Sequence, residues 1–546
     1  SFTHKMVKHE PVTTPLTSYF DDIVWTQEAT KNTCCTGKMC NLGTRIGGTV
    51  AEPLYDLVAI GDINGDKISD VIVYRPSQTR IRVVFGSKTG WSPSGSLSMG
   101  TANSSKFITI TNNSGHSNFL NSSSVYGNAI AVGDLNGDGY DDIAMGYGNG
   151  TTSNIKVFYG SANPVSTNTS AITDVITLPI TTGSTAPSIM IGNFANTAHK
   201  DILALVKTAA GTGSSTAYII YGASSYSLTA EEVTTVASTA GFKITTTSPG
   251  RLETISKISE TGDVNGDGYD DIIFGNYTNN VMYVLFGQSP ANWNTDKTTA
   301  ATGSTPDIVN IDTRVAAGGT EAVKFTNGGT NVGRYTISVA DINGDGTYKD
   351  IFFNSGNYYY VYYGKAAGSW ATVNLSTAAN YDGTNGFRID TVTTKPTWVS
   401  SPLQLAYTAD LNGDGKTDIA FNDWSANTNS LNDSGSSFIL LQPSAGWSSI
   451  WSSGTINLFG DVFDNTGNGL LLNNDIRKGF RIDGEYAESE TAIIQIADID
   501  GDGRNDLIFT SVDEPTFSEV GSTYILFGRN LVPWDALTNV KQLNRF

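Results

Sequence analysis

The stretch GDLNGDGYDDI at residues 133–143 returns almost unchanged as GDVNGDGYDDI at residues 262–272. Acidic and amide side chains alternate along it, and glycines interrupt them. A hard cation such as Ca²⁺ takes about six to eight oxygen ligands, and the alternate side chains of a tight loop can supply them. The stretch therefore predicts a calcium loop, which belongs either to an EF-hand sensor or to a structural repeat.

The pattern occurs seven times, so the chain is a tandem repeat. The copies, called loops 1 to 7 below, are AIGDINGDKISDVIVY at 59–74, AVGDLNGDGYDDIAMG at 131–146, MIGNFANTAHKDILAL at 190–205, ETGDVNGDGYDDIIFG at 260–275, SVADINGDGTYKDIFF at 338–353, YTADLNGDGKTDIAFN at 407–422 and QIADIDGDGRNDLIFT at 495–510. Positions are numbered so that Asp134 of loop 2 is position 1 and Asp142 is position 9.

Each loop is followed by an apolar run and then by a second run that usually ends in an aromatic residue and glycine, as in VFYG at 157–160. The sixth copy departs, with ILLQ at 439–442. A third segment, such as GFRIDT at 386–391, precedes the next copy, so each unit is predicted to hold four short antiparallel strands. One such sheet cannot bury both faces, and seven units arranged radially predict an all-β, seven-bladed β-propeller.

Tryptophans recur a few residues after the aromatic run in most copies. We expect them in the apolar core between blades, in preference to a role as sugar-stacking platforms. They are Trp91, Trp293, Trp370, Trp447 and Trp534.

The acidic loops and the aromatic–glycine strands resemble the FG-GAP repeat of integrin α-subunit propellers and of many secreted proteins. The resemblance covers residues 57–530 or so, nearly the whole chain. It implies the propeller fold, whereas the same fold serves adhesion, sugar binding and catalysis. The domain prediction is an N-terminal arm at 1–56 and a propeller at 57–546.

The arm contains a strand-like stretch, SYFDDIVWTQ at 18–27, and three cysteines, Cys34, Cys35 and Cys40. A strand of the arm could close the propeller as the outer strand of the last blade, or it could pair with a neighbouring subunit and build a polymer. Two of the cysteines are expected to form a small local disulfide, which leaves the third free or bridged to another chain.

The loops predict calcium sites in which positions 1, 3, 5 and 9 supply side-chain oxygens and position 7 a backbone carbonyl, while glycine at position 6 permits the sharp turn. We expect about four to six ions. The predicted ligands are Asp62, Asn64, Asp66, Asp70, Asp134, Asn136, Asp138, Tyr140, Asp142, Asp263, Asn265, Asp267, Tyr269, Asp271, Asp341, Asn343, Asp345, Asp350, Asp410, Asn412, Asp414, Lys416, Asp418, Asp498, Asp500, Asp502, Arg504 and Asp506.

An EF-hand would need a bidentate glutamate at position 12, and that position is apolar in the six acidic loops. The residues there are Val73, Met145, Phe274, Phe352, Phe421 and Phe509. Loop 1 carries Lys67 where glycine belongs, and loop 5 has one extra residue before Asp350. Loop 3 has too few oxygens and is predicted to be empty; its residues at the ligand positions are Asn193, Ala195, Thr197 and Asp201.

Composition excludes some partners. The 33 Lys and Arg against 52 Asp and Glu give a net charge of −19, which argues against nucleic acid. No apolar run reaches about eighteen residues, so membrane insertion is not expected. Eight N-x-S/T sequons agree with a secreted or cell-surface glycoprotein: Asn103, Asn112, Asn121, Asn149, Asn168, Asn276, Asn374 and Asn432.

Three classes of function remain. The four histidines, His4, His9, His116 and His199, belong to no catalytic motif, so an enzyme is not expected, with a polysaccharide lyase as the remote alternative. A calcium-dependent lectin that binds glycans is the second class. The preferred prediction is an extracellular protein of adhesion or structural assembly that acts through protein partners or self-assembly, for example as a filament or surface-layer subunit.

Overall fold

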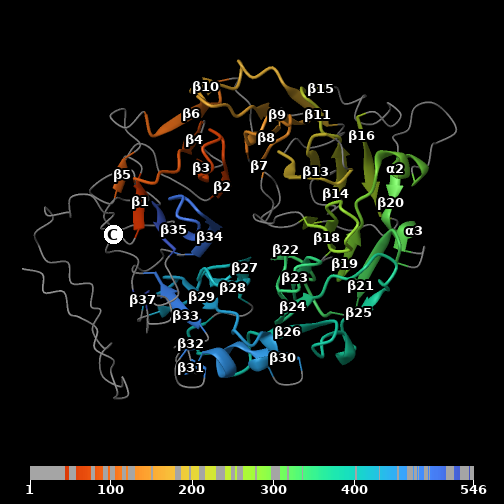
Figure 1. The fold of residues 1–546 in the computed structure, drawn as a ribbon, viewed down its shortest axis with the longest axis vertical. Helices are drawn as coiled ribbons and strands as arrows, with labels where there is room; N and C mark the ends of the chain where they lie inside the picture. Colours follow the sequence, from red (N-terminus) through yellow and green to blue (C-terminus); the bar gives the residue numbers. More distant parts are fainter. Residues whose placement is uncertain are drawn as a thin grey trace, which may run out of the picture.

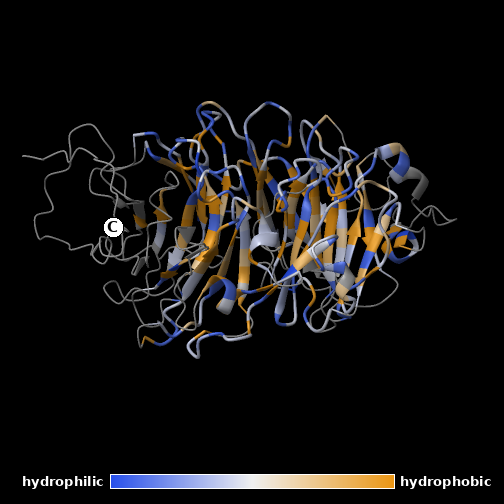
Figure 2. Cartoon of the chain, turned by 60° about the horizontal axis from the view of Figure 1, so that its bottom comes forward, coloured by the Kyte–Doolittle hydropathy of each residue, from blue (hydrophilic) through white to orange (hydrophobic). Residues whose placement is uncertain are grey.

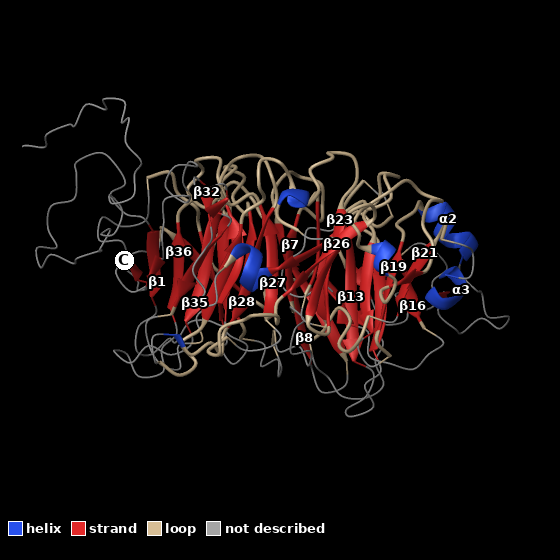
Figure 3. Cartoon of the chain, turned by 90° about the horizontal axis from the view of Figure 1, so that it is seen from below, coloured by secondary structure: helices blue, strands red, loops and turns tan. Residues whose placement is uncertain are grey.

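The computed structural model describes residues 43–47, 57–74, 80–89, 96–98, 105–113, 119–120, 129–148, 152–178, 186–195, 198–207, 215–228, 240–246, 253–254, 262–276, 279–296, 308–315, 319–326, 328–334, 336–399, 403–428, 431–451, 454–463, 471–472, 476–477, 479–484, 490, 492–511, 522–528 and 540–541. These residues form a ring of seven five-stranded β-sheets (Figure 1). The seven-bladed β-propeller predicted from the sequence is therefore confirmed. From the side, the strands stand next to one another and the loops gather at the two ends of the ring (Figure 3).

The first four blades follow the chain in order. Blade 1 holds β2 (Leu57–Gly61), β3 (Asp70–Tyr74), β4 (Arg80–Val84), β6 (Phe107–Thr111) and β10 (Thr167–Asn168). Blade 2 holds β7 (Ile130–Gly133), β8 (Asp142–Gly148), β9 (Ser153–Phe158), β11 (Val175–Leu178) and β15 (Ser227–Leu228). Blade 3 holds β12 (Ser188–Gly192), β13 (Asp201–Lys207), β14 (Ser215–Ile220), β16 (Gly241–Thr245) and β20 (Ile308–Asn310). Blade 4 holds β17 (Glu253–Thr254), β18 (Ile272–Asn276), β19 (Val281–Leu285), β21 (Ala322–Thr326) and β25 (Val373–Asn374).

The last three blades complete the ring. Blade 5 holds β22 (Ile337–Ala340), β23 (Asp350–Ser355), β24 (Tyr358–Tyr362), β26 (Gly386–Asp390) and β30 (Thr455–Asn457). Blade 6 holds β27 (Gln404–Ala409), β28 (Asp418–Asp423), β29 (Ser436–Leu440), β33 (Gly479–Asp483) and β37 (Val540–Lys541). Blade 7 holds β34 (Ala492–Ala497), β35 (Asp506–Ser511), β36 (Ser522–Leu526), β1 (Gly43–Gly47) and β5 (Ser96–Ser98). Outside the blades lie the hairpin of β31 (Leu471–Leu472) and β32 (Ile476–Arg477) and the helices α2 (Pro290–Asp296) and α3 (Ile311–Val315).

A fifth strand at the outer edge of each blade goes beyond the four antiparallel strands predicted from the sequence. It pairs parallel to the fourth strand of its blade. In the sequence, however, each fifth strand lies next to strands that belong to the following blade of the ring. For example, β10 pairs with β6 of blade 1, although it lies between two strands of blade 2 in the sequence. The added strand covers the polar groups that an edge strand would otherwise expose. These strands are two or three residues long, too short for a period-two pattern to be visible in the sequence.

The ring closes between its last and first blades. Strand β1 comes from the N-terminal part of the chain, yet it pairs antiparallel with β36 over five residues in blade 7. On its other side, β1 pairs with β5, which comes from the chain between two strands of blade 1. Segments from both ends of the sequence therefore share one sheet. The cysteines and the stretch at 18–27 lie outside the described residues.

The core of the molecule lies between the blades. The strand after each acidic loop is buried on both faces, and in β8 and β23 every residue is buried. This explains why these strands are continuous apolar runs in the sequence, without the alternation typical of a sheet with one wet face. Seven clusters of buried apolar side chains fill the seven spaces between adjacent blades. The strands of the blades are correspondingly rich in hydrophobic residues, drawn in orange in Figure 2.

The tryptophans that the structure describes belong to this core. Trp293, Trp370 and Trp447 are each 3% exposed or less, and each indole N–H donates to a backbone carbonyl. Trp293 and Trp447 reach the second residue of a neighbouring acidic loop, at the carbonyls of Phe194 and Ile342. Their burial fits packing and leaves no ring face for a sugar. Trp91 and Trp534 lie outside the described residues.

Candidate metal centre: a ring of acidic loops

The carboxylate at position 1 organises each complete loop. In loop 2, Asp134 accepts hydrogen bonds from the backbone N–H groups of Gly137 at 2.7 Å and Gly139 at 2.9 Å. Both glycines have positive φ, +77° and +88°, a conformation that glycine adopts without steric cost. In loop 1 the residue at position 6 is Lys67, which adopts φ +67°, so the strained turn expected from the sequence is present.

Positions 3 and 5 are also tied to the loop. In loop 2, the Asn136 side chain accepts from the N–H of Asp138 at 3.0 Å and donates to its carboxylate at 3.0 Å. The other carboxylate oxygen of Asp138 accepts from the N–H of Tyr140 at 3.0 Å. The N–H at position 7 makes the same bond in loops 4, 6 and 7, where it belongs to Tyr269, Lys416 and Arg504.

The aspartate at position 9 joins its loop to the rest of the blade. The carboxylate of Asp142 is fully buried and accepts from the N–H of Leu135 at 2.8 Å and from the N–H of Gly160 at 2.9 Å. Gly160 is the glycine that ends the aromatic run of the same blade. All seven loops make this pair of bonds, through Asp70, Asp142, Asp201, Asp271, Asp350, Asp418 and Asp506.

This hydrogen bond explains the glycine of the repeat, a link that the sequence alone did not reveal. A Cβ on Gly160 would lie 2.4 Å from the carbonyl oxygen of Asp141, far inside van der Waals contact. The equivalent distance is 2.3–2.5 Å at Gly86, Gly222, Gly287, Gly364 and Gly528. In the sixth copy Gln442 takes this place, and its N–H still donates to Asp418 at 2.8 Å.

Burial raises the pKa of the position-9 carboxyl in the six acidic loops, and neighbouring aspartates of the same loop raise it further. The pKa of Asp70, Asp142 and Asp350 is raised to about 7 and that of Asp506 to about 8. For Asp271 and Asp418 the pKa lies well above its ordinary value, again chiefly because of burial. A bound cation would relieve this cost because it stabilises the ionised carboxylates.

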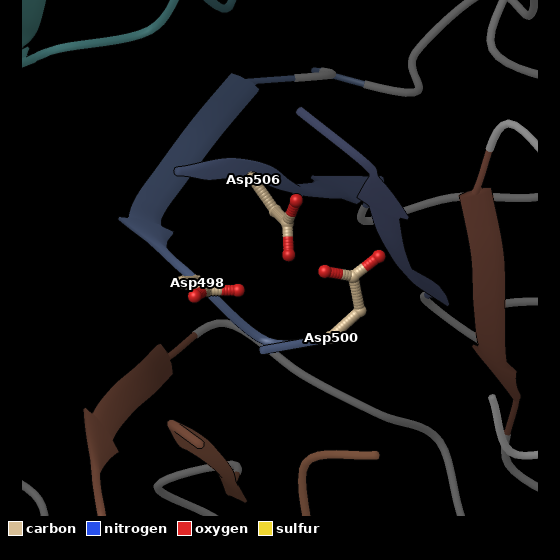
Figure 4. A group of neighbouring side chains, drawn as sticks. All are labelled: Asp498, Asp500 and Asp506. Carbon is tan, nitrogen blue, oxygen red and sulfur yellow. The ribbon is translucent and has the colours of Figure 1, made fainter. Parts of the chain in front are cut away.

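Loop 7 brings its acidic groups closest together. One carboxylate oxygen from each of Asp498, Asp500 and Asp506 lies within 4.8 Å of the others (Figure 4). Among the described residues no other set of three acidic or metal-binding side chains converges in this way. Hard oxygen donors at this spacing fit Ca²⁺, so the donor set is chemically suited to the predicted ion.

The irregular loops keep the position-9 contacts. In loop 5 the extra residue is accommodated, since Asp350 bonds to the N–H groups of Ile342 and Gly364, both at 2.9 Å. In loop 3, Asp201 accepts from the N–H of Gly222 as in the other blades, and its loop-side bond comes from the N–H of Ala195 at position 3 in place of position 2. Thr197 of loop 3 lies outside the described residues.

The burial of the residues at position 12 is consistent with the rejection of an EF-hand. Its six apolar side chains are all 0% exposed and lie in the strands that follow the loops. A glutamate there could not reach the cation without emptying the core between blades.

The loops also touch one another around the ring. The residue at position 8 of one loop donates to the carbonyl at position 1 of the preceding loop, as from Asp141 N–H to Asp62 at 2.9 Å and from Ser69 N–H to Asp498 at 3.1 Å. The side chain at position 7 covers the position-4 glycine of the preceding loop. Such pairs are Tyr140 on Gly65, His199 on Gly137, Tyr348 on Gly266, Arg504 on Gly413 and Ile68 on Gly501.

A central cavity of about 870 Å³ is a second candidate site. The inner strands of blades 1 to 3 give it an apolar wall, with Ile60, Val132 and Met190 among its lining residues. Blades 5 and 6 contribute hydroxyls, and Ser338 and Thr408 of these adjacent blades hydrogen-bond each other in the wall at 2.9 Å. The lining also contains charged side chains from the loops, such as Lys200, Lys349 and Asp270.

Fold and loops together define a β-propeller whose blades are joined at acidic, calcium-type turns. Residues 126–166, which contain loop 2, match the FG-GAP repeat family, so the resemblance inferred from the sequence is confirmed. No curated protein matches the chain. No helix among the described residues is both long and apolar enough to span a membrane.

Several solved structures are similar to this chain at low identity. One is an Agrocybe aegerita lectin that recognises non-reducing terminal N-acetylglucosamine, with 13% identity, 87% of this chain and 100% of that chain covered, and a TM-score of 0.39. An exotype rhamnogalacturonan lyase has 10% identity, coverage of 87% and 81%, and a TM-score of 0.31. The C-terminal domain of Pseudomonas aeruginosa PilY1 has 10% identity, coverage of 69% and 81%, and a TM-score of 0.34. These similarities are too distant to transfer an activity.

The glycine–aspartate contact can be tested by substitution. Gly160→Ala is expected to lower the free energy of unfolding by about 1–3 kcal/mol, because the added Cβ must displace backbone. Gln442→Ala is the control, since that position already carries a Cβ, and it should cost clearly less. Urea unfolding of both variants measures the difference. Equal costs would contradict the steric explanation.

Proposed function

We propose that the protein is an extracellular, calcium-stabilised β-propeller that serves adhesion or structural assembly through protein–protein contacts. The observation that carries the proposal is the double use of the acidic loops. Their side chains supply oxygens for a cation, while their backbone carbonyls bind the neighbouring blade. Ions in these loops would fix the blades relative to one another and leave the outer surface free for a partner.

Calcium is the ion that suits these loops. The donors are carboxylate, amide and carbonyl oxygens without sulfur or imidazole in the ligand positions, a set preferred by Ca²⁺. The ion has a structural role in this proposal, because the position-9 carboxylate is buried inside the blade and position 12 is core. Loop 3 stays empty.

Several features favour a binding role over catalysis or sugar recognition. His199 is the one histidine in the described part of the chain, and its ring lies against Gly137 of loop 2. The position-9 aspartates, although their pKa is perturbed, are held by backbone N–H groups in every blade. Trp293, Trp370 and Trp447 are buried, which weakens the lectin alternative for these three rings.

An extracellular location follows from the proposed calcium dependence and the FG-GAP repeat. The exposure of each sequon asparagine would then decide whether it can carry an N-linked glycan. Asn276 is 0% exposed and would stay unmodified in the folded chain, whereas Asn432 is exposed.

Calcium is expected to raise the melting temperature. Each occupied site adds about 2.7 kcal/mol at a calcium concentration one hundred times its dissociation constant, provided that the unfolded chain does not bind the ion. Differential scanning calorimetry of calcium-depleted protein, titrated with CaCl₂ and in parallel with MgCl₂, measures the effect. A melting temperature that calcium leaves unchanged would refute the structural role.

The calcium effect should grow with pH. In the calcium-free protein, folding raises the pKa of Asp142 to about 7 and that of Asp506 to about 8, so the folded state binds more protons than the unfolded chain. Its stability is therefore expected to fall as the pH rises from about 4 toward 8. Calcium replaces the protons, and the rise in melting temperature should be larger near pH 8 than near pH 5. The opposite trend would contradict this assignment.

The assembly role can be tested by truncation. The full chain is expected to form species larger than a monomer, and a variant without residues 1–30 is expected to be monomeric. The truncated chain keeps β1 and can still close blade 7. Size-exclusion chromatography with light scattering, followed by electron microscopy, separates the two states. Monomers of both proteins at all concentrations would count against assembly.

A further inference from the structure

The junction between blades 7 and 1 closes the ring, and segments from the two ends of the sequence meet there. The chain crosses this junction directly through the connection from β1 to β2, and β1 itself is held in blade 7 by pairing with β36. The ring is therefore closed by the non-covalent pairing of β1 with β36.

Loop 7 bridges this junction through its backbone. The carbonyl of Asp498 accepts from the N–H of Ser69, and the carbonyl of Ile499 accepts from the N–H of Ser87, both at 3.1 Å. A Cβ added to Gly501 would lie 3.0 Å from the side chain of Ile68, so the loop and blade 1 are in close contact. Positions 1, 2 and 4 of loop 7 all touch blade 1, and position 1 is also a predicted metal ligand.

Loop 7 differs from the other acidic loops at position 3. It carries Asp500, where loops 1, 2, 4, 5 and 6 carry asparagine, and therefore holds four carboxylates in place of three. Asp500 is 5% exposed, and its carboxylate faces that of Asp506 (Figure 4). Its Oδ1 accepts from the N–H of Asp502 at 3.2 Å, and its Oδ2 receives no hydrogen bond from the described residues. A buried carboxylate directed at another carboxylate points to a cation between them.

We propose that loop 7 is the high-affinity calcium site of the ring, and that calcium bound there clasps the last blade to the first. This inference rests on the proposed structural role of calcium. The additional carboxylate strengthens the attraction for a divalent cation, because ligand charge is a main determinant of calcium affinity in loops of this kind. An ion that fixes Asp498 and Asp500 also fixes the carbonyls that hold blade 1. Calcium then closes the ring at a concentration at which the three-carboxylate loops are still empty.

Asp500→Asn tests the clasp with little risk to folding, since asparagine occupies this position in five other loops. Hydrogen exchange of the full chain is followed by mass spectrometry during a calcium titration. In the wild type, peptides from 57–74 and 492–511 should gain protection at a calcium concentration about tenfold lower than peptides from loops 2 and 4. Asp500→Asn should raise the midpoint at the junction about tenfold and leave the midpoints at loops 2 and 4 unchanged.

Asn412→Asp is the matched control, because it adds the same carboxylate to loop 6. It should lower the calcium midpoint of loop 6 without shifting that of the junction between blades 7 and 1. Protection that begins at the other loops before the junction, or an Asp500→Asn variant with the wild-type midpoint, would overturn the clasp and leave the proposed function intact. No calcium-dependent protection in any loop would overturn the proposed calcium role itself.

Discussion

In every blade one buried aspartate carboxylate accepts a hydrogen bond from its own loop and another from the main chain at the end of the third strand. The loop, the second strand and the third strand are thereby held in one geometry. A carboxylate in apolar surroundings is costly unless its oxygens are satisfied, and charge-assisted bonds to backbone N–H groups are among the stronger ones. In six blades the donor is a glycine, and its backbone passes so close to the carbonyl next to the aspartate that a Cβ would clash; in the sixth copy Gln442 makes the same bond.

The same constraint sets the relation between neighbouring blades. Position 9 fixes the loop on its own blade, so positions 1, 2 and 4 are presented to the next blade in a constant orientation. Tyr140 and His199 can therefore pack on the glycine of the preceding loop by the same geometry, although their side chains differ. A repeat whose contacts are nearest-neighbour contacts gains stability by adding equivalent interfaces, and closing the ring removes the two unpaired ends. The closing interface is the exceptional one, because there the partner strand comes from the other end of the chain.

Much of this organisation could be predicted from the sequence. The spacing of Asp134, Asn136 and Asp138 before a buried strand indicates both a cation loop and a repeat, since side-chain chemistry and periodicity are local properties. Three features could not be predicted. The bond from Gly160 to Asp142 joins residues 18 apart, and neither residue reveals the other. The parallel strands such as β10 are too short to leave a pattern. The contacts between loops depend on the ring, which no single repeat contains.

Loop 3 separates the two roles of the acidic loop. It lacks the carboxylates at positions 1 and 5, and alanine stands at position 3, yet Asp201 keeps both hydrogen bonds, at 2.7 Å to Ala195 and 2.8 Å to Gly222. Blade 3 forms in the same way as its neighbours. The position-9 carboxylate and its two hydrogen bonds are therefore common to all seven blades, whereas blade 3 forms without the acidic residues at positions 1 and 5. The acidic side chains at these positions in the other six loops need a separate explanation. An ion that ties each loop to the next blade would provide one.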